Sequence, residues 1–171
     1  SVPIPGPDYM GISANKLLET VSDTVQDLVV EYGKCWKLLK AELSKSGIVI
    51  ASVSDLNPNQ QAWLAEFYRT RVHPLLTPLA LDVSHPFPFI SNNSLNIAVR
   101  LKDHDGSPLY ARVKVPLSVL PRFISVPCRS GETFVQLEDI IMTHVSSLFP
   151  GFSIDGAHVF RVTRNADVKV T

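Results

Sequence analysis

Two stretches of alternating apolar and polar residues, separated by a turn, limit what this chain can fold into more than any other feature. Every second residue is apolar in residues 95–102, and the same alternation returns in residues 109–115. A segment with a period of two forms a strand that buries one face and leaves the other polar. Residues 103–107 between them are rich in turn formers. The pattern predicts a β-hairpin, so the chain must build a sheet over a core.

A long helical pattern precedes the hairpin. From Ser13 onward, apolar residues recur at spacings of three and four, which predicts a helix with one apolar side. Gly47 favours an end there because glycine readily adopts the left-handed conformation of helix C-termini. A helix of about 30 residues spans roughly 45 Å, so we expect it to pack on a partner helix and the chain to be a piece of a longer protein. The apolar positions are Leu17, Leu18, Val21, Val25, Leu28, Val29, Tyr32, Trp36, Leu39 and Leu43.

The later segments alternate between helices and short strands. Asn57, Pro58 and Gln60 form the pattern of a helix start, and that helix is expected to reach about Val72. Prolines between residues 73 and 94 exclude further helix and disfavour a strand, so we expect an irregular crossing. We predict strands at residues 48–51, 122–126, 133–135 and 157–162, and a helix at residues 137–148. The inward residues of the two helices are expected to be Ala62, Leu64, Ala65, Phe67 and Tyr68, then Leu137, Ile140, Ile141, Val145 and Leu148.

These elements divide the chain into three parts. Residues 1–12, rich in proline and glycine, are a linker or arm; residues 13–47 are the long helix; and residues 48–171 are a domain. The fold class is α+β, a mixed or antiparallel sheet with helices packed on it, preceded by a long N-terminal helix.

Composition excludes several classes of function. Sixteen Lys and Arg balance sixteen Asp and Glu, so any polyanion site must be local, and we expect no nucleic-acid partner. The longest apolar run, residues 47–53, is far shorter than the roughly 20 residues of a membrane helix, which predicts no transmembrane segment. Cys35 and Cys128 lie far apart and show neither disulfide nor zinc spacing, which favours a reducing, cytoplasmic setting.

The polar side of the hairpin is the first candidate site. Alternation places four cations there, and like charges across a sheet repel, so an anionic partner would relieve them. The alternative is an ordinary solvated face with Asp103 and Asp105 as counter-charges, and the sequence leaves both interpretations open. The four residues are Arg100, Lys102, Arg112 and Lys114.

Two arginines near the end of the chain are the second candidate. Arg161 and Arg164 lie at the last predicted strand, and a guanidinium holds phosphate oxygens well through two parallel hydrogen bonds. The alternative is that Arg161 pairs with Asp155 or Asp167 at the edge of the sheet.

The histidines indicate no metal or catalytic centre. None has the neighbouring histidine, cysteine or acidic residue at the spacing of a metal site. Glycine-rich phosphate loops and nucleophile motifs are also absent from the sequence. We therefore assign no catalytic and no metal-ligating residue. The five histidines are His73, His85, His104, His144 and His158.

Seven segments carry a resemblance to a known family. They follow one another without a large gap, which makes a chance similarity improbable. In order they read NQQAWL (59–64), VHPLLTPL (72–79), HPFPFISNNSLN (85–96), VLPRFI (119–124), FVQLEDII (134–141), LFPG (148–151) and FRVTRNAD (160–167). In these segments the chain resembles the polyphosphate kinase family.

The resemblance implies a reaction and a place in it. Members transfer the terminal phosphate of ATP to polyphosphate, with Mg²⁺ and through a phosphorylated histidine. By resemblance, residues 48–171 are the middle (head) domain, and residues 13–47 are the last long helix of an N-terminal helical domain. The family's catalytic histidine belongs to a His-x-Lys motif in the C-terminal domains, and no histidine here has a lysine two residues later. We therefore expect the chain alone to be inactive and to bind neither ATP nor Mg²⁺.

The resemblance also implies partners. A head domain helps to form the homodimer or higher oligomer and walls the tunnel of the polymer, next to the C-terminal catalytic domains. The alternative is an interaction module that serves dimerisation and interdomain packing without touching a ligand. In the first case the residues expected to contact polyphosphate are Arg161, Arg164, Arg100, Lys102, Arg112 and Lys114.

Overall fold

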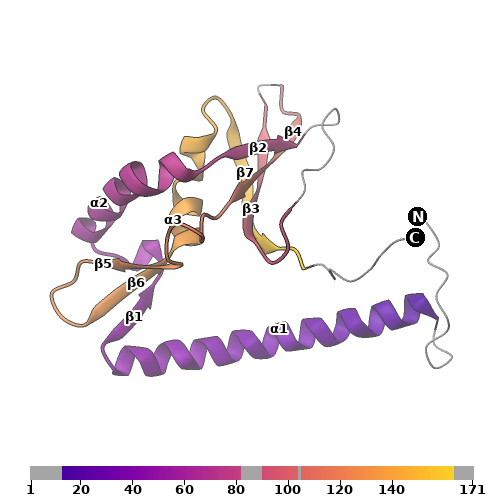
Figure 1. The fold of residues 1–171 in the computed structure, drawn as a ribbon, viewed down its shortest axis with the longest axis horizontal. Coiled ribbons are helices and arrows are strands. Elements are labelled where there is room, and N and C mark those ends of the chain that lie inside the picture. The colour runs from indigo at the N-terminus through magenta and orange to yellow at the C-terminus, as the bar shows by residue number, and fades with distance from the viewer. Residues whose placement is uncertain (1–12, 82–89, 104, 164–171) are drawn as a thin grey trace. The chain divides into compact units, whose positions relative to one another are not determined.

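The computed structural model describes residues 13–81, 90–103 and 105–163 (Figure 1). The chain divides into two compact units, the first ending at Ser46 and the second beginning at Gly47. One long helix makes up the described part of the first unit, and the second unit holds all the strands.

The helix of the first unit, α1, spans Ala14–Lys45 and confirms the predicted long helix. Ser13 caps its start, because the Ser13 hydroxyl accepts a hydrogen bond from the backbone N–H of Lys16 at 3.4 Å. Gly47, with φ at +80°, follows its end in the left-handed conformation expected there. Apolar side chains along α1 are exposed, Leu18 to 70%, and the packing of this helix on a partner stays a prediction.

Sheet A of the second unit has three strands in the order β1-β6-β5. β1 (Ile48–Ala51) runs parallel to β6 (Glu132–Gln136), and β5 (Phe123–Val126) runs antiparallel to β6. The turn before β6 fits against the start of β1 because Gly131 has no side chain: a Cβ there would lie 2.5 Å from the carbonyl oxygen of Gly47. The three strands predicted in this region are confirmed to within one residue at each end.

Sheet B has four antiparallel strands in the order β2-β4-β3-β7. The predicted hairpin is confirmed as β3 (Leu95–Lys102) and β4 (Pro108–Lys114). The last strand, β7 (Ser153–Arg161), begins earlier than predicted. The register of β7 against β3 shifts opposite Arg100 and Leu101, which interrupts the alternation on which the prediction was based.

The prediction of an irregular crossing over residues 73–94 was wrong for the first part of this segment. A short 3-10 helix, η4, covers His73–Leu75, and a strand, β2, covers Pro78–Leu81. β2 lies at an edge of sheet B, and Pro78 is its first residue. These are the positions at which a missing N–H is tolerated in a sheet. Residues 82–89 of the crossing lie outside the described residues.

The second helix, α2 (Pro58–Phe67), starts as predicted. The side chain of Asn57 accepts a hydrogen bond from the Gln60 backbone N–H at 3.1 Å, and the Gln60 side chain accepts one from the Asn57 N–H at 3.2 Å. This reciprocal capping satisfies two backbone groups that a helix start leaves open. The helix then continues as a π-helical turn, η3 (Tyr68–Val72), which reaches the predicted end.

The buried side of this helix differs from the predicted one. Leu64, Tyr68 and Val72 are buried and stand four residues apart, whereas Ala62 and Ala65 are exposed. In an α-helix, residues four apart drift by about 40°. The wider π turn reduces that drift and helps to keep the three large side chains on the core side. The prediction from a period of 3.6 residues, that Ala62 and Ala65 face the core, was therefore wrong.

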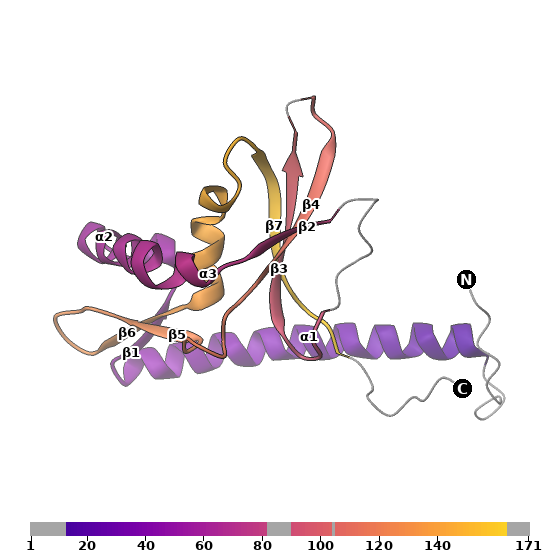
Figure 2. The same cartoon turned by 45° about the horizontal axis from the view of Figure 1, so that its top comes forward.

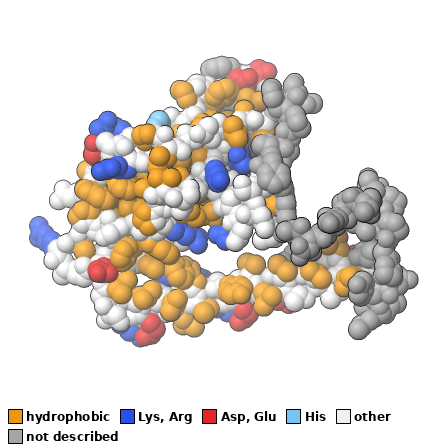
Figure 3. All heavy atoms as spheres, in the orientation of Figure 1, with side chains coloured by type: hydrophobic (Ala, Val, Ile, Leu, Met, Phe, Trp, Pro, Cys, Tyr) orange, Lys and Arg blue, Asp and Glu red, His pale blue; other side chains and the backbone are white. Residues whose placement is uncertain are grey.

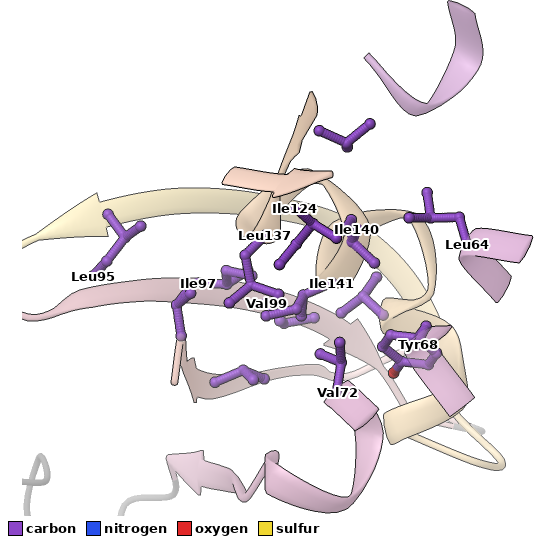
Figure 4. Packing of buried hydrophobic residues seen from close by; sticks show 14 of the residues in the cluster. Leu64, Tyr68, Val72, Leu95, Ile97, Val99, Ile124, Leu137, Ile140 and Ile141 are labelled. Carbon is purple, nitrogen blue, oxygen red and sulfur yellow. The ribbon is translucent and has the colours of Figure 1, made fainter. Parts of the chain in front are cut away.

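One hydrophobic core joins both sheets. α3 (Leu137–Thr143) and the 3-10 turn η5 (Val145–Leu148) lie between the sheets in both ribbon views (Figures 1 and 2). Ile140 and Ile141 are fully buried and belong to one cluster with residues of sheets A and B, α2 and η3. Figure 4 shows the side chains of this cluster converging around α3. The fold class is α+β, as predicted. Among the described residues, no helix combines the length and apolar character needed to cross a membrane.

Candidate functional site

The outer face of sheet B, which points away from the core, gathers the four hairpin cations. On β3 the core side is formed by apolar residues such as Val99, so Arg100 and Lys102 point outward. On β4 the register places Arg112 opposite Ala98 and Lys114 opposite Asn96, which puts them on the same face. We call Arg100, Lys102, Arg112 and Lys114 the cationic face; Figure 3 shows Lys and Arg side chains over this part of the domain.

At one end of the cationic face, Asp155 of β7 pairs with two of the cations. The carboxylate oxygens of Asp155 lie 2.9 Å from Nε of Arg100 and 2.7 Å from Nζ of Lys102. The hydrogen bond from Lys102 and the charge of Arg100 lower the pKa of Asp155 against the opposing effect of desolvation. The sequence suggested Asp103 and Asp105 as counter-charges, but Asp105 accepts hydrogen bonds from Ser107 instead.

The other end of the cationic face has no acidic partner among the residues that the structure describes. Within residues 13–81, 90–103 and 105–163, neither Arg112 nor Lys114 forms an ion pair. Arg112 is half-buried, and its Nε is buried without a hydrogen-bond acceptor. Two neighbouring cations without a carboxylate among the described residues favour the approach of an oxygen-rich anion.

Asn96 lies beside the unpaired end, and its burial was not predicted from the sequence. It faces Lys114 across the strands and is fully buried, although alternation places it on the polar side. Its Nδ2 donates to the carbonyl oxygen of Ser94 at 2.9 Å and to the Ser94 hydroxyl at 3.0 Å, while its Oδ1 has no hydrogen-bond partner within the described parts of the chain. No periodicity could distinguish this asparagine from an exposed one.

Arg161 is separated from the cationic face. It pairs in register with Leu95, whose side chain is in the core, so Arg161 lies on the opposite face of sheet B, at its end. Its Nη1 donates to Oδ1 of Asn93 at 3.0 Å. The expected alternative partner Asp155 is engaged by the cationic face, and Arg164 and Asp167 lie outside the described residues.

Two of the described histidines, His73 and His144, pack against Tyr68, whereas His158 is exposed on β7 opposite Ala98, on the same face of sheet B as Arg112. His144 stacks on Tyr68 with ring centroids 4.3 Å apart, and its Nδ1 lies 2.9 Å from the carbonyl oxygen of Ile140. His73 meets the same tyrosine edge-on at 5.7 Å. Burial raises the pKa of Tyr68. No group of three or more His, Cys, Asp or Glu is placed to hold a metal ion in the described part of the chain. His85 and His104 fall outside it.

Two of the segments that carry the family resemblance meet in a partly buried ion pair. Arg122 precedes β5, and Glu138 lies in the first turn of α3 with only 4% of its surface exposed. Nε of Arg122 donates to Oε1 of Glu138 at 2.8 Å. The backbone N–H of Leu137 also donates to the carbonyl oxygen of Arg122 at 2.7 Å. These motifs therefore hold β5 against α3, which is a structural role.

One hollow of the second unit lies away from the predicted site residues. It encloses about 850 Å³ between the start of α2 and the turn before β6. It is open and shallow, and none of the predicted site residues lines it. The lining residues are Asn57, Pro58, Asn59, Gln60, Trp63, Pro127, Cys128, Arg129 and Ser130.

Comparisons with known proteins agree with one another. The family profile described as "Polyphosphate kinase middle domain" matches residues 59–171. A polyphosphate kinase from Synechocystis sp. is 41% identical over 94% of this chain, and one from Dictyostelium discoideum is 37% identical over 90% of it. The crystal structure of a polyphosphate kinase from Porphyromonas gingivalis matches 91% of this chain with a TM-score of 0.76 and 28% identity.

The matched proteins are much longer than this chain. It spans 23% of the Synechocystis protein, 15% of the Dictyostelium protein and 26% of the Porphyromonas chain. The match to the Synechocystis protein covers 94% of this chain, which is more than the second unit alone contains. The similarity therefore extends into the first unit and includes most of α1.

Proposed function

This chain belongs to the polyphosphate kinase family, as its middle domain, and from that premise we propose that it serves a longer kinase as a non-catalytic wall in contact with polyphosphate. In this proposal the longer enzyme transfers the terminal phosphate of ATP to polyphosphate, with Mg²⁺, through a phosphohistidine outside residues 1–171. The absence of a His-x-Lys motif from the chain supports this division. ATP and Mg²⁺ then belong to the catalytic domains, and the chain alone turns over no ATP.

The observation that carries the proposal is the unpaired end of the cationic face. Phosphoryl transfer depends on positioning and on electrostatic stabilisation, so a wall can contribute cations without taking part in bond chemistry. Among the described residues, the half-buried Arg112 and the exposed Lys114, two residues away on the same face, have no ion-pair partner. Together they suit the closely spaced oxygens of a linear polyanion.

Arg161 and Arg164 are proposed as a second contact with the polymer. Arg161 is exposed and donates to a neutral amide, Asn93, and no described carboxylate pairs with it. Since Arg161 lies on the opposite face from Arg112, the two contacts involve different stretches of polymer.

A double substitution of Arg112 and Lys114 tests whether the chain contacts polyphosphate as a wall of the longer enzyme. Arg112→Gln/Lys114→Gln in the 171-residue chain should weaken binding of long-chain polyphosphate by about tenfold at low salt, because two phosphate contacts are lost. The slope of log affinity against log salt should fall by roughly one to two. Titration of a labelled polyphosphate at several salt concentrations measures both quantities.

A matched pair on α1 provides the control. Lys34→Gln/Lys45→Gln removes the same charge from exposed residues that each pair with a glutamate of α1 at 2.7 Å. We expect this variant to bind polyphosphate like the unchanged chain. Equal losses in the two variants would contradict a local site, and no binding by the unchanged chain would remove the wall altogether.

A packing module is the second candidate function, and the outer face of sheet A favours it. Ile48, Ile50, Phe123 and Phe134 line an apolar hollow of about 230 Å³ there. Apolar surface of this kind is typical of contacts with other domains or subunits. Sedimentation of the chain with and without polyphosphate separates the candidates: the module self-associates and ignores polyphosphate, and the wall binds it.

Oligomeric state and location are parts of the same proposal. We place the longer enzyme in the cytoplasm as a homodimer or higher oligomer, next to its own catalytic domains. The exposed, unpaired thiols of Cys35 and Cys128 suit a reducing compartment.

A further inference from the structure

A β-bulge in β7 decides which residues share the cationic face. Gly156 pairs with Arg100 and Ile154 pairs with Leu101, so Asp155 is an extra residue between two consecutive pairs. Such a bulge shifts the alternation of one strand by one position and re-aims a side chain.

The bulge exchanges the faces of two neighbouring side chains. In a regular strand Asp155 would oppose Leu101, which is buried at 4% exposure, and Ile154 would point outward. With the bulge, Ile154 packs against the core and Asp155 reaches the outer face. A carboxylate is thereby placed among cations by the backbone, not by chance contact of flexible side chains.

Asp155 holds its two cations where solvent still reaches them. The side chains of Arg100 and Lys102 are 55% and 50% exposed, and that of Asp155 is 24% exposed. One carboxylate contacts both cations, and its negative charge also repels an approaching phosphate. The paired end thus has two cations with one carboxylate, whereas Arg112 and Lys114 have no carboxylate within the described residues.

We propose that Asp155 is a specificity-determining residue that withholds Arg100 and Lys102 from polyanions and, on the cationic face, confines binding to the Arg112–Lys114 end. This inference rests on the proposed contact with polyphosphate. Asp155 and a phosphate compete for Arg100 and Lys102, because both present anionic oxygens to the same two donors. The bulge keeps Asp155 in place. Removing the charge of Asp155 frees both donors.

The test is a gain of binding. Asp155→Asn keeps the size of the side chain and removes its charge, so it should bind long-chain polyphosphate roughly three- to tenfold more tightly at low salt, with a steeper dependence on salt. A triple variant, Asp155→Asn/Arg100→Gln/Lys102→Gln, should return to the affinity of the unchanged chain. Thermal melting of each variant verifies that it is folded, and Asp155→Ser replaces Asp155→Asn if the latter does not fold.

The outcomes separate the inference from the proposed function. Equal binding by the unchanged chain and Asp155→Asn overturns the inference and leaves the wall intact. A gain that persists in the triple variant also overturns it, because the released cations are then not its cause. Binding by Asp155→Asn alone removes the wall in the natural sequence, and it overturns the inference as well, because there is then no binding for Asp155 to confine. Binding by neither protein removes both.

Discussion

The outer faces of the two sheets differ although their inner faces share one core. Sheet A turns Ile50, Phe123 and Phe134 outward, and sheet B turns outward the cationic face and Asp155. An apolar face is stabilised when another protein surface covers it, whereas a cationic face is stabilised by an anion. From this difference we propose that the domain combines both candidate functions, protein contact on sheet A and polymer contact on sheet B.

The largest effect is expected where the two sheets depend on each other. Ile140 has no exposed surface and belongs to the cluster shared by both sheets. Ile140→Ala should lower the free energy of unfolding by about 2–5 kcal/mol through lost burial and the cavity left behind. Urea denaturation measures the loss, and hydrogen exchange in β3 and β6 shows whether both sheets are affected.

The control for this substitution is a surface residue of the same unit. Val119 is 64% exposed, and Val119→Ala should change stability by less than about 0.5 kcal/mol. If Ile140→Ala increased exchange in one sheet and left the other protected, the two sheets would unfold separately. They would then not depend on one shared core.

A smaller effect is expected on sheet A alone. Glu138→Gln removes the charge that Arg122 contacts and should cost about 1–3 kcal/mol, because the pair lies at the start of the buried α3. Hydrogen exchange should rise in β5 and stay unchanged in β3. Glu132→Gln, at an exposed position of β6, is the matched control and should leave both strands as they were. Equal loosening of β3 would contradict the local role.

Substitutions on the outer face of one sheet at a time should have a still smaller effect on the protein. They are the sharpest test of whether the two sheets have separate tasks. Phe123→Ser/Phe134→Ser should reduce the fluorescence of an apolar dye by about twofold and leave polyphosphate affinity unchanged. Arg112→Gln/Lys114→Gln should do the reverse. Dye titration and polyphosphate titration of both variants give four values, and a loss of both kinds of binding in either variant would end the division of tasks.

Much of the fold could be predicted because it is locally encoded. Alternation of apolar residues gave the hairpin of sheet B, since the period of two survives in β3 and β4. The capping pair Asn57 and Gln60 gave the start of α2, because its contacts span three residues. Such signals need no knowledge of the rest of the chain.

The features of the site that escaped prediction all depend on tertiary contacts. Asp155 joins the cationic face only because a bulge shifts β7, and a bulge leaves no reliable trace in alternation. The burial of Asn96 and the pairing of Arg122 depend on packing between distant segments. Charge placement on one strand was therefore predictable, and the partner of each charge was not.

The smallest expected effect concerns pH and the paired end of sheet B. The hydrogen bond from Lys102, with the charge of Arg100, lowers the pKa of Asp155 from its ordinary value of 3.8. The folded chain thus binds this proton less readily than the unfolded chain, so the pair contributes its full stability above the unfolded value and loses it as pH falls through the folded value. Melting temperatures of the unchanged chain and Asp155→Asn should differ near neutral pH and converge only below the folded pKa of Asp155, which lies under 3.8. A difference that persisted at the lowest pH would show that Asp155 acts as a neutral hydrogen-bonding group, and sheet B would then lose the carboxylate that divides its cationic face.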